Sequence, residues 1–328
     1  LIPNGFEKAG YHFIGWATSA GGEVEFTDED SYPMGTESEY TLYAVWEANE
    51  NTLHFDGKGA TSGTTEDMTI ATDETVTLIP NGFEKAGYHF IGWATSADGE
   101  VKFTDEDSYP MGTESEYTLY VVWEANINTL RFDKNDEKAT GEMPSIQMKT
   151  DEVQNLPAVG FEKSGYHLKG WATSTDGEVE FANEGSYTMG TESEYTLYAV
   201  WEANENTLHF DGNGATSGTM EDMTITTHAT ATLIPNDFER VGYIYKGWAT
   251  SKENADRQIV NYENEAVYTM GTESEYTLYA VWEVITYSIT YELNGGQHTN
   301  PATFTVEDLP LAINAAKNEV NPKVWTKI

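Results

Sequence analysis

The chain has 328 residues and no cysteine, and its 55 acidic residues outnumber 17 basic ones to give a net charge of −38. The lack of cysteine excludes a disulfide framework and thiol chemistry. Nucleic acids and anionic membrane surfaces are recognised through Lys and Arg, so this composition argues against both as partners. No apolar run reaches the roughly 20 residues of a membrane span, and we expect no membrane insertion.

A ten-residue stretch, MGTESEYTLY, occurs four times without a change. Each copy leads into a Val-Trp pair. A Gly-Trp-Ala-Thr stands 30 residues before each of the first three of these tryptophans and 34 residues before the last. The Gly-Trp tryptophans recur at spacings of 77, 78 and 77 residues. A fixed period of this kind is the signature of a repeat architecture.

The period predicts tandem small domains, each large enough to bury a modest core. We expect an incomplete repeat at residues 1–50 that lacks its opening strands, and an incomplete repeat at 287–328 that has only the opening strands. Between them we expect complete repeats at 51–127, 128–205 and 206–286.

The first complete repeat opens with an alternating strand that places Leu53 and Phe55 on one face. Residues 56–63 form a loop rich in Asp, Gly and Ser, which are turn residues. Further strands are expected around residues 68–70 and 76–78.

Residues 83–87 are the one place in the repeat with room for a helical turn, and a strand follows at residues 88–93. Simple alternation puts Trp93 on the face whose residues vary between copies, which is the behaviour of a solvent face. A β-bulge at Gly92 would turn the tryptophan back towards the core, because glycine in a strand often marks such a bulge.

A short edge strand is expected at residues 100–103 and a longer strand at 117–123. Alternation in the longer strand places Leu119, Val121 and Trp123 towards the core, with Tyr120 and Val122 outside. Five or six short strands separated by turn signals predict an all-β or mainly β fold.

The combination of Leu53-His54-Phe55, the strand from Gly87 to Trp93 and the strand from Tyr117 to Trp123 resembles the Listeria–Bacteroides repeat, the internalin B-repeat type. The resemblance covers nearly the whole chain. It implies a small β-grasp-like repeat strung in series, in a bacterial surface protein, between a functional head and the cell wall. This chain is more acidic than many such repeats, so charge-dependent binding is not carried over.

Two sets of aromatic residues are candidates for specific roles. One tryptophan before and one after each MGTESEYTLY stretch are expected to anchor the cores: Trp16, Trp46, Trp93, Trp123, Trp171, Trp201, Trp248 and Trp282. The outward tyrosines of the last strands suit contact with a glycan or protein: Tyr43, Tyr120, Tyr198 and Tyr279. The alternative is that these tyrosines pack against a neighbouring repeat or a covering loop.

Nothing in the sequence points to catalysis, a metal or a cofactor. Paired carboxylates can serve glycosidases, but the acidic run at residues 28–30 is replaced in later copies by sequences such as 183–185. No clustered zinc ligands appear. Residues 133–137 carry the odd-position oxygens of a calcium loop without its glycine or its terminal Glu, and whether the acidic loops bind calcium stays open. We expect a non-enzyme.

The sequence therefore predicts an elongated rod of tandem domains that serves as the extracellular stalk or spacer of an adhesin-like protein on the bacterial cell surface. The alternative is a multivalent module that recognises a host or matrix protein or glycan through its repeated aromatics. Neighbouring repeats are expected to contact one another. The half-complete sheets at the two ends also predict end-to-end self-association between molecules.

Overall fold

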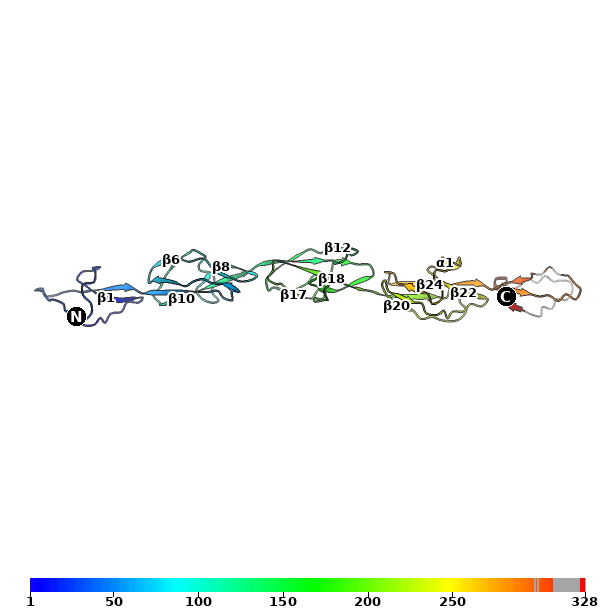
Figure 1. Cartoon of the computed structure of the whole chain (residues 1–328), viewed down its shortest axis with the longest axis horizontal. Coiled ribbons are helices and arrows are strands. Elements are labelled where there is room, and N and C mark those ends of the chain that lie inside the picture. Colours follow the sequence, from blue (N-terminus) through cyan, green and yellow to red (C-terminus); the bar gives the residue numbers. More distant parts are fainter. Residues whose placement is uncertain (298, 300, 309–324, 328) are drawn as a thin grey trace. The chain divides into compact units, whose positions relative to one another are not determined.

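The computed structural model describes residues 1–297, 299 and 301–308, and the backbone of residues 325–327. The fold is mainly β, as the sequence predicts, and contains three similar four-stranded sheets in tandem (Figure 1). Much of the predicted repeat at 287–328 lies outside the described residues.

The contacts divide the chain into two units. The first unit contains Leu1–Phe132, Pro144–Leu156 and Gly185–Leu197. The second contains Asp133–Met143, Pro157–Glu184 and Tyr198–Ile328. The boundary falls within the third repeat, so the second repeat lies in the first unit and the fourth repeat lies in the second.

Each four-stranded sheet is mixed. In the second and fourth repeats, the first and last strands of the repeat lie side by side and parallel, and each has an antiparallel partner on its other side. The second repeat has the order β5 (Met68–Ala71), β3 (Glu50–Asp56), β10 (Glu116–Ala125), β8 (Tyr88–Ala94). The third has β13 (Ile146–Lys149), β11 (Ile127–Asp133), β18 (Glu194–Ala203), β16 (Tyr166–Ala172). The fourth has β20 (Met223–Thr226), β19 (Glu205–Asp211), β24 (Glu275–Val284), β22 (Tyr243–Ala249).

A parallel central pair requires a long crossover connection. Here the crossover is built from extended segments that form small antiparallel ribbons. In the second repeat these are β4 (Ser62–Gly63) with β7 (Phe83–Glu84), and β6 (Thr75–Thr77) with β9 (Ser108–Pro110). In the third they are β12 (Thr140–Gly141) with β15 (Phe161–Glu162), and β14 (Val153–Asn155) with β17 (Ser186–Thr188). In the fourth, β21 (Thr230–Thr232) pairs with β23 (Val267–Thr269).

Two local predictions are wrong. Residues 83–87 form no helical turn, because the backbone of Phe83 and Glu84 pairs with Ser62 and Gly63. Residues 100–103 form only an isolated bridge, in which Phe103 and Trp93 exchange backbone hydrogen bonds.

The bulge predicted at Gly92 is present. Phe90 pairs with Trp123 and Gly92 with Val122, so Ile91 is the extra residue of β8. Gly92 has a φ of 150°, and a Cβ at this position would lie 2.7 Å from the carbonyl oxygen of Phe103. Because the bulge resets the alternation, Trp93 enters the core and is fully buried.

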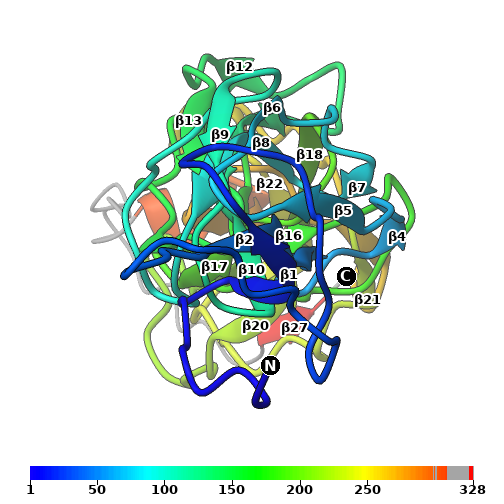
Figure 2. The same cartoon turned by 90° about the vertical axis from the view of Figure 1, so that its left-hand side faces the viewer.

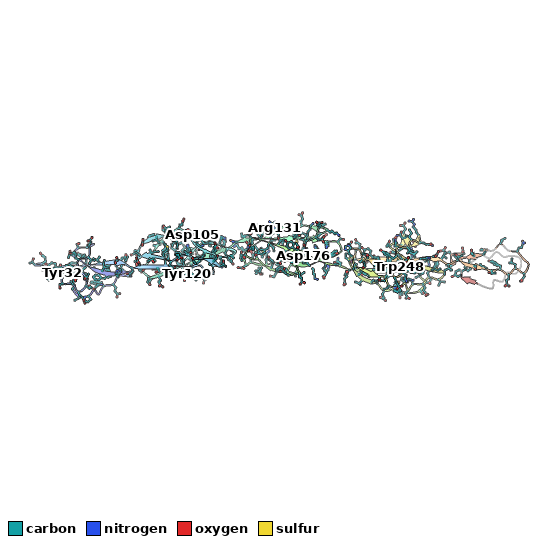
Figure 3. All side chains as sticks on the ribbon, viewed as in Figure 1. Tyr32, Asp105, Tyr120, Arg131, Asp176 and Trp248 are labelled. Atoms are coloured by element: carbon teal, nitrogen blue, oxygen red, sulfur yellow. The ribbon has the colours of Figure 1, made fainter. Side chains whose placement is uncertain are left out.

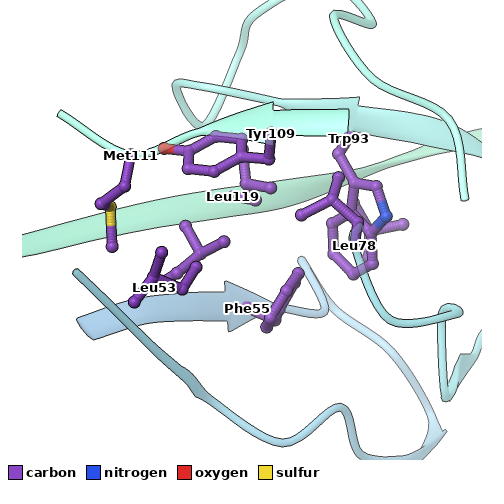
Figure 4. Close-up of a cluster of buried hydrophobic side chains, with 9 residues drawn as sticks. Leu53, Phe55, Leu78, Trp93, Tyr109, Met111 and Leu119 are labelled. Atoms are coloured by element: carbon purple, nitrogen blue, oxygen red, sulfur yellow. The ribbon is translucent and has the colours of Figure 1, made fainter. Parts of the chain in front are cut away.

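The core of the second repeat surrounds Trp93 (Figure 4). The rings of Phe55 and Phe90 meet the Trp93 indole edge-on, with centroids 4.9 Å and 5.2 Å away. The remaining buried members are Leu53, Ile70, Leu78, Tyr109, Met111, Leu119 and Val121. Trp248 occupies the same place in the fourth repeat (Figure 3).

The fourth repeat carries an α-helix, α1 (Lys252–Asp256), where its sequence is four residues longer than the others. Ser251 caps the helix by accepting a hydrogen bond from the backbone N–H of Asn254. Ala255 is buried against Ala249 and Val281.

The first repeat contributes the antiparallel pair β1 (Tyr11–Ala17) and β2 (Tyr43–Ala48), drawn in blue in Figures 1 and 2. Beyond the fourth repeat lies a three-stranded sheet of order β26 (Thr303–Phe304), β25 (Tyr287–Ile289), β27 (Trp325–Lys327), with a 3-10 turn, η1 (Val306–Asp308).

Candidate functional site: the junctions between repeats

A single residue separates the last strand of one repeat from the first strand of the next. Asn49 stands between β2 and β3, Asn126 between β10 and β11, and Asn204 between β18 and β19. The Asn49 N–H donates to the carbonyl of Gly10 in the preceding repeat at 2.8 Å, and its carbonyl accepts from the N–H of Thr72 in the following repeat at 2.9 Å. Asn126 and Asn204 make the same two bonds. The linking backbone is therefore hydrogen-bonded to both neighbours.

Each of these junctions also contains a buried Asn–Thr pair. The Asn51 side-chain amide donates to the Thr72 hydroxyl at 2.9 Å and to the carbonyl of Gly112 at 3.2 Å. Among the described residues, the buried polar side chains all belong to these pairs: Asn51, Thr72, Asn128, Thr150, Asn206 and Thr227. A buried polar group is stable only when its hydrogen bonds are made. Each pair therefore holds the first strand of the following repeat, its threonine and the glycine of its MGTESEYTLY stretch in fixed relative positions.

The preceding repeat meets the threonine with a glycine. Gly10, Gly87 and Gly165 have φ between 75° and 79°, a left-handed conformation that glycine adopts without strain. A Cβ on Gly87 would lie 2.6 Å from Cγ2 of Thr150 and 3.1 Å from Cα of Thr191. Glycine thus allows the two repeats to approach to backbone contact.

A tyrosine next to the glycine bonds across the junction. Tyr88 donates its hydroxyl hydrogen to Oδ2 of Asp151 at 2.6 Å, and Tyr11 does so to Asp73 at 2.8 Å. The bond to Asp151 raises the pKa of the Tyr88 phenol, with smaller contributions from burial and from the charge of the carboxylate. Tyr166 instead contacts Nδ1 of His228 at 3.2 Å.

A histidine on the surface of each junction contacts the linking asparagine. Nδ1 of His89 lies 2.8 Å from Oδ1 of Asn126, and its Nε2 lies 3.4 Å from Glu124. His12 and His167 have the same pair of neighbours in their own junctions.

These residues line an open groove that occurs at three junctions, with volumes of about 560, 810 and 800 Å³. A histidine, a glutamate, two asparagines, a threonine and a serine recur in its walls: His89, Glu124, Asn126, Asn128, Thr191 and Ser193 in the second junction. Such a groove presents hydrogen-bonding groups in the same arrangement three times.

The junction explains much of the unchanged MGTESEYTLY stretch. Met111 and Leu119 are core residues, and the Gly112 carbonyl accepts from Asn51. The Tyr117 hydroxyl accepts from the N–H of Glu114 at 3.0 Å and lies against Gly112, where a side chain would collide with the ring. Thr113 contacts the glycine of the preceding repeat through its Cα. The side chains of Glu114, Ser115 and Glu116 are exposed, and the structure gives no reason for their constancy.

The predicted tryptophans occupy two kinds of position. Trp93, Trp171 and Trp248 are fully buried. Trp123 and Trp201 are half-buried and Trp282 is buried. Their indole N–H groups donate to the carbonyls of Gly57, Lys134 and Gly212 at 2.8–2.9 Å. Trp16 and Trp46 of the first repeat are half-buried, and both meet the ring of Phe13 edge-on.

The predicted contact tyrosines differ in exposure. Tyr43 is 40% exposed, whereas Tyr120, Tyr198 and Tyr279 are half-buried (Tyr120 in Figure 3). In the fourth repeat, Tyr279 packs against the buried cluster that holds Ala255 of α1.

Carboxylates of the acidic loops accept hydrogen bonds from neighbouring strands and from their own turns. Asp28 and Asp105 accept from the indole N–H of Trp16 and Trp93 at 3.2 Å (Asp105 in Figure 3). Asp30 accepts from the backbone N–H and hydroxyl of Thr27, and these bonds lower the pKa of its carboxyl.

In the calcium-like stretch, Asp133 accepts from the N–H of Asn135, and Asp136 accepts from that of Lys138. Asp136 also pairs with Lys163 at 2.8 Å, which contributes most to lowering the pKa of its carboxyl. Over residues 1–297, 299 and 301–308, no three His, Cys, Asp or Glu side chains gather in a way that could hold a metal ion.

Sequence comparison identifies the repeats. Residues 1–45, 52–122, 129–200 and 207–281 match the Listeria-Bacteroides repeat domain, and the chain belongs to this family. It is 31% identical over 303 residues to a "Putative Gly-rich membrane protein" of Evansella cellulosilytica, with 89% of this chain and 33% of that protein covered. A "Putative membrane protein" of the same organism is 28% identical over 259 residues, with 77% of this chain and 35% of that protein covered.

The chain therefore spans about a third of the length of these curated relatives. In the described part of the chain, no helix has the length and apolarity needed to cross a membrane.

Proposed function

We propose that this chain is a non-catalytic spacer in the stalk of an adhesin-like protein on the outside of a bacterial cell. The observation that carries the proposal is the one-residue junction, in which Asn49, Asn126 and Asn204 are hydrogen-bonded to the repeats on both sides. A chain whose domains meet without free linkers is suited to hold what it carries at a set distance. The surface proteins that share this repeat, and the two relatives named as membrane proteins, agree with a place at the cell envelope.

The arrangement of carboxylates supports a structural role. The acidic residues that could pair for acid–base chemistry accept hydrogen bonds from backbone, indole or hydroxyl groups of their own repeat, as Asp28, Asp30 and Asp105 do. The high acidity also keeps an exposed surface soluble.

Immunolabelling of intact cells of the source organism tests the proposed location. An antibody raised against this segment should label unpermeabilised cells, and treatment of those cells with protease should remove the signal. Labelling that appears only after permeabilisation would overturn the proposal. An antibody against a cytoplasmic protein is the control for cell integrity.

The second candidate is a multivalent module that binds a host or matrix protein or glycan. The groove that recurs at three junctions favours it, since one ligand type could be held several times along the chain. Arrays of glycans and matrix proteins should be probed with the full chain and with variants at Tyr120 and in the groove, such as Ser193→Ala with Glu124→Gln. Binding that these substitutions weaken, and that is lost when Ser115 and Ser274 are also replaced by Ala, would establish the module. The spacer proposal predicts no binding that depends on them.

A further inference from the structure

The junction that follows the fourth repeat shares one of the two linking backbone hydrogen bonds, the glycine and the tyrosine with the other three. The N–H of Ile285, at the place of the linking asparagine, donates to the carbonyl of Gly242 at 2.8 Å. Gly242 has a φ of 81° and faces Val306 where the other glycines face a threonine. Tyr243 donates its hydroxyl hydrogen to Oε1 of Glu307 at 2.9 Å, as Tyr11 and Tyr88 do to aspartates in the first two junctions.

Its side chains differ at five positions around the linking residue, whereas Glu283 keeps the place of Glu47, Glu124 and Glu202. In the junction between the third and fourth repeats the set is His167, Asn204, Asn206, Ile225 and Thr227, which we call the polar set. In the next junction the corresponding residues are Ile244, Ile285, Tyr287, Phe304 and Val306, which we call the apolar set. At these five positions the two junctions carry different side chains.

Within the polar set the groups satisfy one another. The Asn206 amide donates to the Thr227 hydroxyl at 2.9 Å, and these two side chains are 2% and 4% exposed. His167 lies 2.7 Å from Oδ1 of Asn204.

The apolar set is held by packing. The rings of Tyr287 and Phe304 stack with centroids 5.3 Å apart, and Ile285 is buried. Valine has nearly the shape of threonine without the hydroxyl. A polar set with valine in place of Thr227 therefore fits in shape, but the buried Asn206 amide loses one of its two hydrogen bonds and keeps the one to Gly271. An apolar set with one buried asparagine has the same defect.

We propose that these sets are two alternative coupling surfaces. A repeat with Gly-Tyr-His at the junction accepts a following repeat that carries the Asn–Asn–Thr residues of the polar set (Asn204, Asn206 and Thr227 here). A repeat with Gly-Tyr-Ile at the junction accepts one that carries the Ile–Tyr–Val residues of the apolar set (Ile285, Tyr287 and Val306 here). The fourth repeat then serves as an adaptor, because it begins with the polar set and ends with the apolar glycine face. The partner that fits each surface is a repeat of this family with the matching set.

This inference concerns which repeats can be neighbours and stands apart from the spacer proposal. If the sets prove interchangeable, a spacer of unordered repeats remains.

The test exchanges the sets in the full chain at the junction between the third and fourth repeats, and follows hydrogen exchange of the Asn204 and Thr227 amides, which hold this junction. Thr227→Val alone should speed exchange of both amides ~10-fold, the effect of one lost hydrogen bond to the buried Asn206 amide. Replacement of all five residues by the apolar set should return exchange to within about threefold of the natural chain. Thr226→Val, at the exposed neighbouring position, is the matched control and should change neither amide.

Two single substitutions and their combination provide a second test if the fivefold variant fails to fold. His167→Ile and Asn204→Ile are surface changes, and each alone should loosen the junction while the two together recover part of the loss. Effects that simply add in the double and fivefold variants would overturn the proposal, because matched sets require that the residues depend on one another.

Discussion

Replacement of Gly87 by alanine tests the close approach of two repeats. Gly87 has a φ of 75°, and a Cβ there would lie 2.6 Å from Cγ2 and 2.8 Å from Oγ1 of Thr150. Gly59 of the same repeat provides the matched control. Its φ is 76°, and a Cβ on it would have no atom within 4 Å.

Both substitutions carry the backbone strain of a left-handed alanine, ~1–2 kcal/mol. Gly87→Ala must also move Thr150 or the backbone of Thr191, and overpacking of this kind costs ~1–3 kcal/mol more. A difference of that size corresponds to a roughly 5- to 150-fold change in an equilibrium. We therefore expect Gly87→Ala, and not Gly59→Ala, to open the junction by such a factor.

Hydrogen exchange of the Asn126 and Thr150 amides measures this opening, because their hydrogen bonds span the junction. Exchange at both should accelerate in Gly87→Ala and stay near natural values in Gly59→Ala. In a Thr150→Ala background, where the colliding atoms are absent, the added effect of Gly87→Ala should fall. Equal effects of the two glycine substitutions on these amides would refute the reasoning.

Three further predictions concern single repeats in the full chain. Tyr245→Phe should raise the stability of the fourth repeat by ~1 kcal/mol, because the Tyr245 hydroxyl is buried without a hydrogen-bond partner among the described residues. The same burial raises the pKa of the Tyr245 phenol. The reverse change at the equivalent position, Phe90→Tyr, should lower the stability of the second repeat. Trp123→Ala should destabilise the second repeat by ~3–5 kcal/mol and leave exchange in the core of the fourth unchanged; simultaneous loss of both would contradict it. Thr104 lowers the pKa of the Asp107 carboxyl in the folded chain through two hydrogen bonds. Ionised Asp107 therefore stabilises the fold at pH values above its unfolded pKa of ~3.9, and this stabilisation is lost as the pH falls through the lower pKa of the folded state. The melting temperatures of Asp107→Asn and the natural chain should differ at pH 6 and converge towards pH 3; a constant difference would exclude this linkage.

The sequence was sufficient to predict the elements that rest on alternation. Leu53 and Phe55 mark β3, and Leu119 and Val121 mark β10, since each pair is apolar in period two and buried. The bulge at Gly92 was also predictable, because only a change of phase could bring the tryptophan into the core.

Short elements fixed by distant pairing were not predictable. Phe83 and Glu84 form a strand only because Ser62 and Gly63 lie beside them, and β9 contains Pro110, which is unusual in a strand. Their local sequence offers no period to recognise.

Contact between neighbouring repeats was expected, but the residues that make it were not identified, because the junction asparagines lie in a polar stretch typical of a loop. A signal was nevertheless present: Asn51 and Thr72 recur in the next two copies and are replaced together, by Tyr287 and Val306, in the last. Joint replacement of two polar residues by apolar ones indicates contact between them.

Force spectroscopy of the full chain, pulled from its two ends, tests the central claim. The claim is that the chain is a series of separately folded repeats joined at junctions whose linking residues are hydrogen-bonded to both neighbours. The three complete repeats should unfold in three separate events. Each event should lengthen the chain by roughly 250 Å, the extended length of about 77 residues less their folded span. Gly87→Ala should leave the length of each step unchanged, since it alters a junction and not a core. A single unfolding event, or steps unrelated to the repeat length, would contradict the account.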